Sequence, residues 1–390
     1  MKKVWNRIAG TALLPALSFL LAFFISGFVI AFSDSTVLKN IGHPGKFITT
    51  ALSTVGNAYL ALFQGSIFDP NLTTGHGFMR GFYPLSETIV TATPLILTGL
   101  AVALAFRAGL FNIGAQGQFI FGAIGASYVG FHFTFTPVLH VTLALLAGII
   151  CAALYGGLVG LLKARTGAHE VIVTIMLNYI AGFFILWILK TTTFLRPRRI
   201  DPIAPEVNPS SQLPHLAGAN FRLHAGILIA LAAAYFVWWI LNRTTIGFQF
   251  RAVGANASAA KTAGISVSKV TIATMSLCGA LAGLGGAVHV LGSQYALTAD
   301  IGGSFGFDAI TVALLGRAKP FGTVLAALLF GALRTGGRTM QSNTTTPLDI
   351  VLVIQALIVL FIASPTLVRA LFKVKNLKTD AAMTAKGWNG

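Results

Sequence analysis

Charged residues are scarce in this sequence, and acidic residues are the scarcest of them. Asp, Glu, Lys and Arg make up 9% of the 390 residues, and Asp and Glu occupy just 10 positions. Average soluble chains contain about 25% charged residues. Because 55% of the residues are hydrophobic, this composition excludes an ordinary soluble protein and indicates a membrane protein with several spans.

Cysteine is also rare, and the common nucleotide and metal motifs are missing. Cys151 and Cys278 lie in apolar runs, where cysteine is a small packing residue. Phe47 follows Gly45-Lys46, which excludes a P-loop, because that motif needs Ser or Thr after the lysine. The eight histidines show no metal-binding spacing. We therefore expect no ATPase site, metal or cofactor in this chain.

Positive charge is present, with a formal net charge of +17. The basic residues lie at the ends of apolar segments and form no single patch, which argues against a nucleic-acid partner. The positive-inside rule explains this distribution, because cytoplasmic loops of membrane proteins are rich in Lys and Arg.

Long apolar segments indicate an all-α integral membrane protein with about ten transmembrane helices, within a range of eight to ten. The segments are 11–32, 86–107, 117–136, 138–162, 170–190, 223–241, 270–292, 304–316, 320–335 and 349–370. The eighth is too short for a full span, so we expect at least one short or broken helix. We interpret the first as an uncleaved transmembrane helix, since it is longer than the apolar core of a signal peptide.

The distribution of Lys and Arg places both termini in the cytoplasm. The chain then has a transmembrane domain over 1–370 with two outer loops, 33–85 and 191–222, and a basic cytoplasmic tail over 371–390. We expect a surface helix over 47–64 and an irregular second loop. Paired glycines, Gly156 with Gly160 and Gly279 with Gly283, predict close helix packing.

The most informative segment is GLAVALAFRAGLFNIGAQGQ, residues 99–118. It places Asn112, Gln116 and Gln118 between two apolar segments, where an unpaired polar group costs several kcal/mol by order of magnitude. The segment is compatible with a turn at the membrane interface or with a substrate pathway. We favour the pathway.

Further polar residues interrupt other apolar segments. Asn178 and Tyr179 lie in the middle of 170–190, where they are compatible with helix–helix bonding or with lining a pathway. Asp308 opens the short eighth segment and is a candidate functional acid. Glu170, at the start of the fifth segment, and Gln355 are weaker candidates.

One cytoplasmic loop, 242–269, is longer than the others and contains GANASAAKTAGIS, residues 254–266. Asn256 or Ser258 is able to cap a short helix there. Small side chains on such a helix suit docking into a groove of a partner, although a solvated linker helix is the alternative.

Four segments resemble the permease family of bacterial ABC importers for branched-chain amino acids, simple sugars and nucleosides. They are PLILTGLAVALAFRAGLFNIGAQGQ (94–118), EVIVTIMLNYIA (170–181), AVGANASAAKTAGI (252–265) and GFDAITVALLGRAKPFGTVLAALLFGAL (306–333). The pair GLFNIGAQGQ and MLNYIA is similar to the nucleoside and sugar branch. Members of this family commonly have an acidic residue where this chain has Gln116.

The resemblance implies a permease subunit in the bacterial inner membrane that moves nucleosides or related sugar-like solutes. It implies three protein partners: an ATPase subunit that holds ATP and Mg²⁺, a second and non-identical permease, and a solute-binding lipoprotein. Candidate pathway residues are Phe111, Asn112, Gln116, Gln118, Asn178, Tyr179 and Asp308. Candidate residues for coupling to the ATPase are Gly254, Asn256, Ala259, Ala260, Lys261 and Gly264.

Two alternatives belong to other classes. A secondary transporter driven by an ion gradient needs charged ion sites at membrane depth, and the acids here lie near segment ends. A membrane scaffold without transport does not explain the glycines and amides inside apolar segments.

Overall fold

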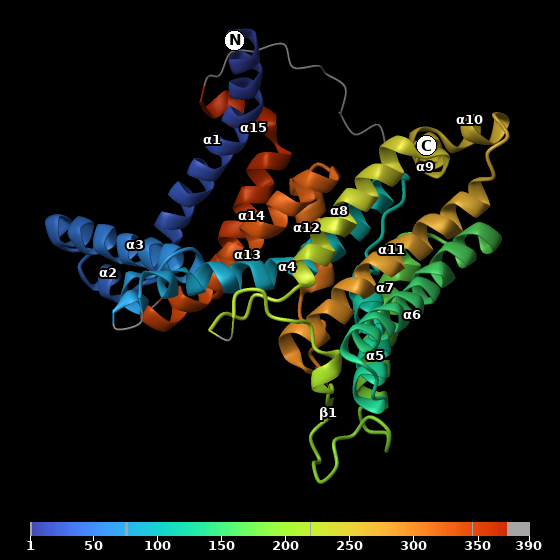
Figure 1. Cartoon of the computed structure of the whole chain (residues 1–390). Helices are drawn as coiled ribbons and strands as arrows, with labels where there is room; N and C mark the ends of the chain where they lie inside the picture. The colour runs from blue at the N-terminus through green and yellow to red at the C-terminus, as the bar shows by residue number, and fades with distance from the viewer. Residues whose placement is uncertain (1, 75–76, 219, 345, 373–390) are drawn as a thin grey trace. The chain divides into compact units, whose positions relative to one another are not determined.

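The computed structural model describes residues 2–74, 77–218, 220–344 and 346–372 (Figure 1). The described residues divide into two compact units. The first runs up to Leu85 and resumes at Leu333, and the second comprises Ser86–Ala332. The predicted cytoplasmic tail, 371–390, lies outside the described residues from 373 onward.

The first unit is helical in the part that the structure describes. Its elements are α1 (Lys2–Ser33), α2 (Ser35–Lys39), α3 (Pro44–Ser66), the 3₁₀ turns η1 (Pro70–Thr73) and η2 (Phe78–Phe82), α14 (Asp349–Ala363) and α15 (Pro365–Leu371). Helix α1 packs against α3, α14 and α15. The hydroxyl of Tyr59 on α3 donates to the carbonyl of Phe23 on α1. The helix predicted over 47–64 is confirmed as α3.

The second unit contains most of the remaining elements. They are α5 (Ala115–His132), α6 (Pro137–Thr166), α7 (Glu170–Ile188), β1 (Ile203–Glu206), η3 (Pro209–Ser211), α8 (Gly226–Arg243), α9 (Thr245–Ala255), α10 (Ala257–Thr262), α11 (Val267–His289), the π turn η4 (Val290–Gln294), β2 (Ala296–Thr298) and α12 (Phe305–Leu315). Helix α4 (Tyr83–Arg107) begins in the first unit, and α13 (Pro320–Asn343) ends in it.

Helices α5, α6 and α11 pack on one another, and α7 packs on α5 and α6 (Figure 1). Glycines allow this close packing. A Cβ built on Gly156 of α6 would lie 2.9 Å from the Cα of Gly279 on α11, and one built on Gly122 of α5 would lie 2.2 Å from the Cα of Gly283. The close packing predicted from these glycine spacings is confirmed, because no larger side chain fits there.

Helix α4 is the most buried of the long apolar helices, and its middle turns, including Leu95, Leu100 and Leu104, are fully buried. A Cβ on Gly285 of α11 would lie 3.3 Å from the Pro94 carbonyl of α4, which shows how closely these helices approach. Helix α4 ends at a left-handed glycine, Gly109 (φ 70°). The amide of Leu110 then donates to the Ala105 carbonyl at 2.9 Å, as in a Schellman motif.

A helix lies at each of the ten predicted apolar segments, which confirms a predominantly helical membrane protein. Among the described residues, six helical segments are long and apolar enough to span a membrane: Ala16–Ser33, Phe78–Arg107, Pro137–Thr166, Glu170–Ile188, Gly226–Arg243 and Val267–Gln294. The eighth predicted segment is confirmed as short, because α12 has 11 residues. The last is broken at Pro365, where α14 gives way to α15.

A small sheet departs from the all-α prediction. Strand β1 pairs antiparallel with β2, with Ile203 opposite Thr298 and Glu206 opposite Ala296. Loop 191–222, predicted to be irregular, therefore contains a strand and a 3₁₀ turn. The pairing fixes it next to the turn that leads into α12.

Candidate functional site

A cavity of about 480 Å³ opens on the second unit between α5, α7 and the turn that precedes α12. Three of the predicted pathway residues line it: Gln116 on α5, and Asn178 and Tyr179 on α7. The rest of the wall consists of Ile113, Ile120, Ile175, Gly182, Ala299, Asp300, Gly302, Gly303 and Phe307. Its size and its mixed lining are typical of a small-molecule site.

Gln116 joins the start of α5 to the start of α12. Its side-chain Nε2 donates to the Gly303 carbonyl at 2.9 Å, and its Oε1 accepts from the Gly306 amide at 2.7 Å. The Gly306 amide is one of the first N–H groups of α12, which have no partner within their own helix. Gln116 therefore caps α12 from a neighbouring helix and uses both ends of its amide to do so.

Asn178 caps the start of α5 in the same way, from its position on α7. Its Oδ1 accepts from the Gly117 amide at 2.8 Å, in the first turn of α5, and its Nδ2 donates to the Ile113 carbonyl at 2.9 Å. The side chain thus bonds α7 to the start of α5, as the first interpretation predicted, and it also borders the cavity. That it lines a solute pathway stays a prediction. Two helices that begin beside one cavity, α5 and α12, present the positive ends of their dipoles there.

Tyr179 and Phe307 give the cavity an aromatic surface. The two residues are 63% and 50% exposed, so both rings are available to a planar ligand. Asp300 adds an exposed carboxylate to the wall. Sequence reasoning missed Phe307 and Asp300. Asp300 follows β2 in a short glycine-rich turn, and no recognised motif marks it.

Four predicted pathway residues do not line this cavity. Asn112 is fully buried, and its Nδ2 donates to Gln118 Oε1 at 3.0 Å while its Oδ1 accepts from the Gly114 amide at 3.0 Å. Phe111 packs against Phe106 with ring centroids 5.1 Å apart.

Asp308, the remaining one, accepts from the hydroxyl of Ser304 at 2.8 Å, one turn earlier on its own chain. Of the weaker candidates, Glu170 pairs with Lys163 across the turn between α6 and α7. Gln355 is buried in α14 of the first unit.

The predicted coupling segment forms α10, a helix of six residues that is capped at both ends. Asn256 is the N-cap, and its Oδ1 accepts from the Ala259 amide at 3.0 Å. At the other end, Gly264 is left-handed (φ 84°), and the Ile265 amide donates to the Ala260 carbonyl at 3.0 Å. These bonds make a Schellman motif. The predicted capping by Asn256 is confirmed.

Most side chains of α10 point outward. Asn256, Ala259 and Lys261 are exposed, whereas Ala260 is 4% exposed and faces the protein. Nothing lies within 4 Å of a Cβ built on Gly264. The segment therefore presents a short helix of fixed conformation with small outward side chains.

Gly254 connects this segment to the loop that leads to the cavity. A Cβ on Gly254 would lie 2.4 Å from the Arg107 carbonyl, and one on Gly109 would lie 2.9 Å from the Gly254 Cα. The end of α9 thus rests directly on the backbone between α4 and α5. The same loop continues through Ile113, a residue of the cavity wall.

Comparisons with known proteins identify the family of this chain. A family described as the branched-chain amino acid transport system permease component matches residues 85–363. The guanosine ABC transporter permease protein NupP of Bacillus subtilis is 39% identical over 337 residues, covering 86% of this chain and 96% of that protein.

Two further relatives match at lower sequence identity. The glucose ABC transporter permease protein TsgB13 of Haloferax volcanii is 34% identical, covering 82% of this chain and 86% of its own length. A second guanosine permease of Bacillus subtilis, NupQ, is 31% identical over 63% of this chain and 78% of its own length. No solved structure matches this chain. The chain belongs to this permease family, and it is a multi-pass permease subunit of an ABC importer.

Proposed function

We propose that this subunit moves nucleosides or related sugar-like solutes inward through the cavity bounded by Gln116, Asn178 and Tyr179. The observation on which the proposal rests is the cavity itself, which combines amides, a carboxylate and exposed aromatic rings in about 480 Å³. Relatives named for guanosine and for glucose support this solute class.

The lining suits a neutral solute with hydroxyl groups and a planar ring. The exposed carboxylate of Asp300 is able to accept hydrogen bonds from ribose or sugar hydroxyls. The rings of Tyr179 and Phe307 offer faces on which a base stacks. Gln116 and Asn178 already use their amides to cap α5 and α12, so we assign them the role of holding the wall in place.

Energy for transport comes, in this proposal, from ATP and Mg²⁺ on a separate ATPase subunit, and this chain hydrolyses no ATP. The exposed helix α10 docks into that subunit, with Gly254, Asn256, Ala259, Ala260, Lys261 and Gly264 forming or supporting the contact. Movement of α10 reaches the cavity wall through the backbone contact of Gly254 with Arg107 and Gly109. ATP binding then shifts the permease pair between outward-facing and inward-facing states.

The second permease is a different chain. Bacillus subtilis has two proteins named as guanosine permeases, NupP and NupQ, and both are similar to this chain. We place a solute-binding lipoprotein on the outer side and assign the transmembrane domain to residues 1–370, with both termini and the tail, 371–390, in the cytoplasm. About ten helices cross the membrane in this arrangement.

The proposal is tested by affinity purification of the tagged chain in mild detergent, followed by reconstitution into proteoliposomes. We expect a P-loop ATPase and a second permease to co-purify, and ATP to drive uptake of labelled guanosine. Recovery of the chain alone, together with uptake that needs an ion gradient and no ATP, would contradict it.

The docking role of α10 is tested separately with Gly264→Val. A β-branched residue at φ 84° costs on the order of 1–2 kcal/mol, so the end of α10 distorts and ATP-driven uptake falls while membrane insertion is retained. Gly218→Val is the matched control. Gly218 is also left-handed, with φ 76° and nothing within 4 Å of its Cβ, but it lies in the predicted outer loop. Equal loss of uptake in both variants would refute the assignment.

A further inference from the structure

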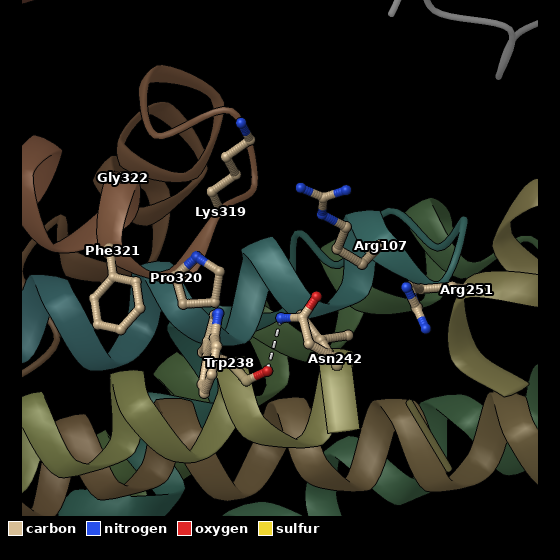
Figure 2. A pocket seen from close by; sticks show the side chains of 9 residues that line it. Arg107, Trp238, Asn242, Arg251, Lys319, Pro320, Phe321 and Gly322 are labelled. Carbon is tan, nitrogen blue, oxygen red and sulfur yellow. Dashed lines mark hydrogen bonds between the residues drawn. The ribbon is translucent and has the colours of Figure 1, made fainter. Parts of the chain in front are cut away.

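A second cavity of the same unit, about 330 Å³ in volume, lies where α4 ends, between α8, α9 and the turn that opens α13 (Figure 2). Arg107, Arg251 and Lys319 line one part of it, and Trp238, Leu241 and Phe321 line another. In Figure 2 the Arg107 guanidinium lies between the side chains of Lys319 and Arg251. The transport proposal uses none of these side chains.

Three cations in one cavity need a counter-charge. The four ion pairs found within the described residues involve other cations: Lys163, Arg196, Arg199 and Arg222. Arg107, Arg251 and Lys319 come from three different elements, so their convergence results from the fold and not from a run of basic sequence. Such a group attracts an anion with several oxygens, and arginine in particular matches phosphate geometry.

The cationic part of the cavity is held in position by the backbone. Arg317 and Ala318 both have positive φ, 54° and 49°, and this tight turn directs the Ala318 carbonyl toward α4. Arg107 Nε donates to that carbonyl at 2.9 Å, which fixes the guanidinium while its terminal nitrogens lie at the cavity. A left-handed conformation is unfavourable for residues other than glycine, so the surrounding fold must hold both residues of this turn in place.

The other part of the cavity is apolar and continues onto exposed apolar side chains of α13. The rings of Trp238 and Phe321 have centroids 6.3 Å apart, and Phe321 is 54% exposed. Leu325, one helical turn further along α13, is 70% exposed. A soluble anion gains nothing from such a surface, whereas the acyl chains of a lipid do.

We propose that this cavity binds the phosphate of an anionic phospholipid, with its acyl chains along Trp238, Phe321 and Leu325. Basic pockets between transmembrane helices on the cytoplasmic side bind lipid headgroups in this manner, and the predicted topology places the cavity on that side. Arg107 also belongs to the backbone turn on which Gly254 rests. A bound lipid therefore contacts α4, α9 and the start of α13 and stabilises their arrangement, next to the contact of Gly254 with Arg107 and Gly109.

The test measures lipid binding to the purified full-length chain in detergent by native mass spectrometry, with dioleoyl phosphatidylglycerol as the probe. Dioleoyl phosphatidylcholine and inorganic phosphate are tested alongside it. The variants are Arg251→Gln and Lys319→Gln. Arg243→Gln is the matched control, because Arg243 ends α8 close by but does not line the cavity.

We expect phosphatidylglycerol to bind in preference to phosphatidylcholine. Each cavity variant should weaken this binding roughly fivefold, as expected for one cation near a lipid headgroup, and Arg243→Gln should leave it unchanged. Inorganic phosphate should neither bind measurably nor displace the lipid. This readout needs no transport, so it is independent of whether the proposed solute is correct.

Four results would overturn the proposal. Equal binding of both lipids, or equal loss in Arg243→Gln, would show general surface charge. Displacement of the lipid by inorganic phosphate would show a site for a soluble anion. Unchanged lipid binding in Arg251→Gln and Lys319→Gln, combined with loss of the co-purified ATPase, would show that the cavity receives an acidic group of that protein.

Discussion

Two pairs of amides in and around the same sequence motif have different positions in the fold. Asn112 and Gln118 bond to each other in a fully buried pair. Gln116 and Asn178 instead cap neighbouring helices and border the cavity. The first pair holds the loop between α4 and α5 to the first turns of α5, and the second pair shapes the wall of the cavity that we propose as the solute pathway. Residue type alone therefore does not distinguish an amide buried in the packing from one that borders the cavity.

The largest effect is expected from breaking the buried pair with Asn112→Leu. Gln118 and the Gly114 amide then lose their partners in a site closed to water, where each unsatisfied group costs about 1–3 kcal/mol. We expect a large drop in the midpoint of thermal unfolding in detergent and a poor yield of folded protein. The double variant Asn112→Leu/Gln118→Leu should recover part of the loss, because both partners become apolar. An unfolding midpoint unchanged in the single variant would contradict this view.

A smaller effect on stability is expected from Asn178→Ala. The change removes the cap of α5, typically worth about 1 kcal/mol, and the bond to the Ile113 carbonyl, worth about as much. The unfolding midpoint should fall less than in Asn112→Leu, and ATP-driven uptake should fall as the cavity wall shifts. Asn178→Asp keeps the acceptor for the Gly117 amide and serves as the control. Its midpoint should lie between those of the wild type and Asn178→Ala; a value at or below that of Asn178→Ala would argue against the capping role.

Gln116→Glu tests the second amide that borders the cavity, because it removes one of the two bonds that Gln116 makes. A carboxylate still accepts from the Gly306 amide, but it has no proton to donate to the Gly303 carbonyl. Since acids are common at this position in the family that the sequence resembles, we expect the complex to assemble. Stability should fall by about 1 kcal/mol, and uptake should fall several-fold because the turn before α12 loosens. Wild-type uptake in this variant would show that the bond to Gly303 is dispensable.

The smallest effect is expected from Tyr179→Phe. Tyr179 is 63% exposed, and removing its hydroxyl leaves the ring in the cavity. The unfolding midpoint should be unchanged and uptake should stay within about a factor of two, since the account assigns the ring to stacking. Tyr179→Ala, which removes the ring, should reduce uptake clearly more; equal uptake in the two variants would remove the ring from the pathway.

Much of the fold was predictable from local sequence. Ten apolar segments correspond to helices because length and apolarity are properties of the segment alone. The capped helix α10 was predictable for the same reason, since Asn256 supplies its own cap within three residues. The sequence could not show which neighbouring helix each amide faces, because Gln116 and Gln118 differ by two positions and their partners lie 190 and 6 residues away.

The acidic residue that lines the cavity also could not be predicted from local sequence. The sequence drew attention to Asp308 because it opens a short apolar helix, but that side chain bonds to Ser304. The cavity acid is Asp300, which reaches the wall because β2 pairs with β1 from a distant loop. Such a pairing leaves no local signal in a chain with few strands.

The most direct test of the pathway is to fill the cavity. Gly182 lines it, and nothing lies within 4 Å of a Cβ built there, so the backbone at this position leaves space for a side chain to enter the cavity, and Gly182→Trp adds bulk there. Gly56→Trp on α3 is the control, because its Cβ also meets nothing within 4 Å and it is not among the residues that line the cavity. We would measure ATP-driven guanosine uptake in proteoliposomes after confirming that both partners co-purify. The account predicts uptake at least about tenfold lower in Gly182→Trp, equivalent to about 1.4 kcal/mol, and near wild type in the control. Undiminished uptake with tryptophan at position 182 would show that the solute takes another route.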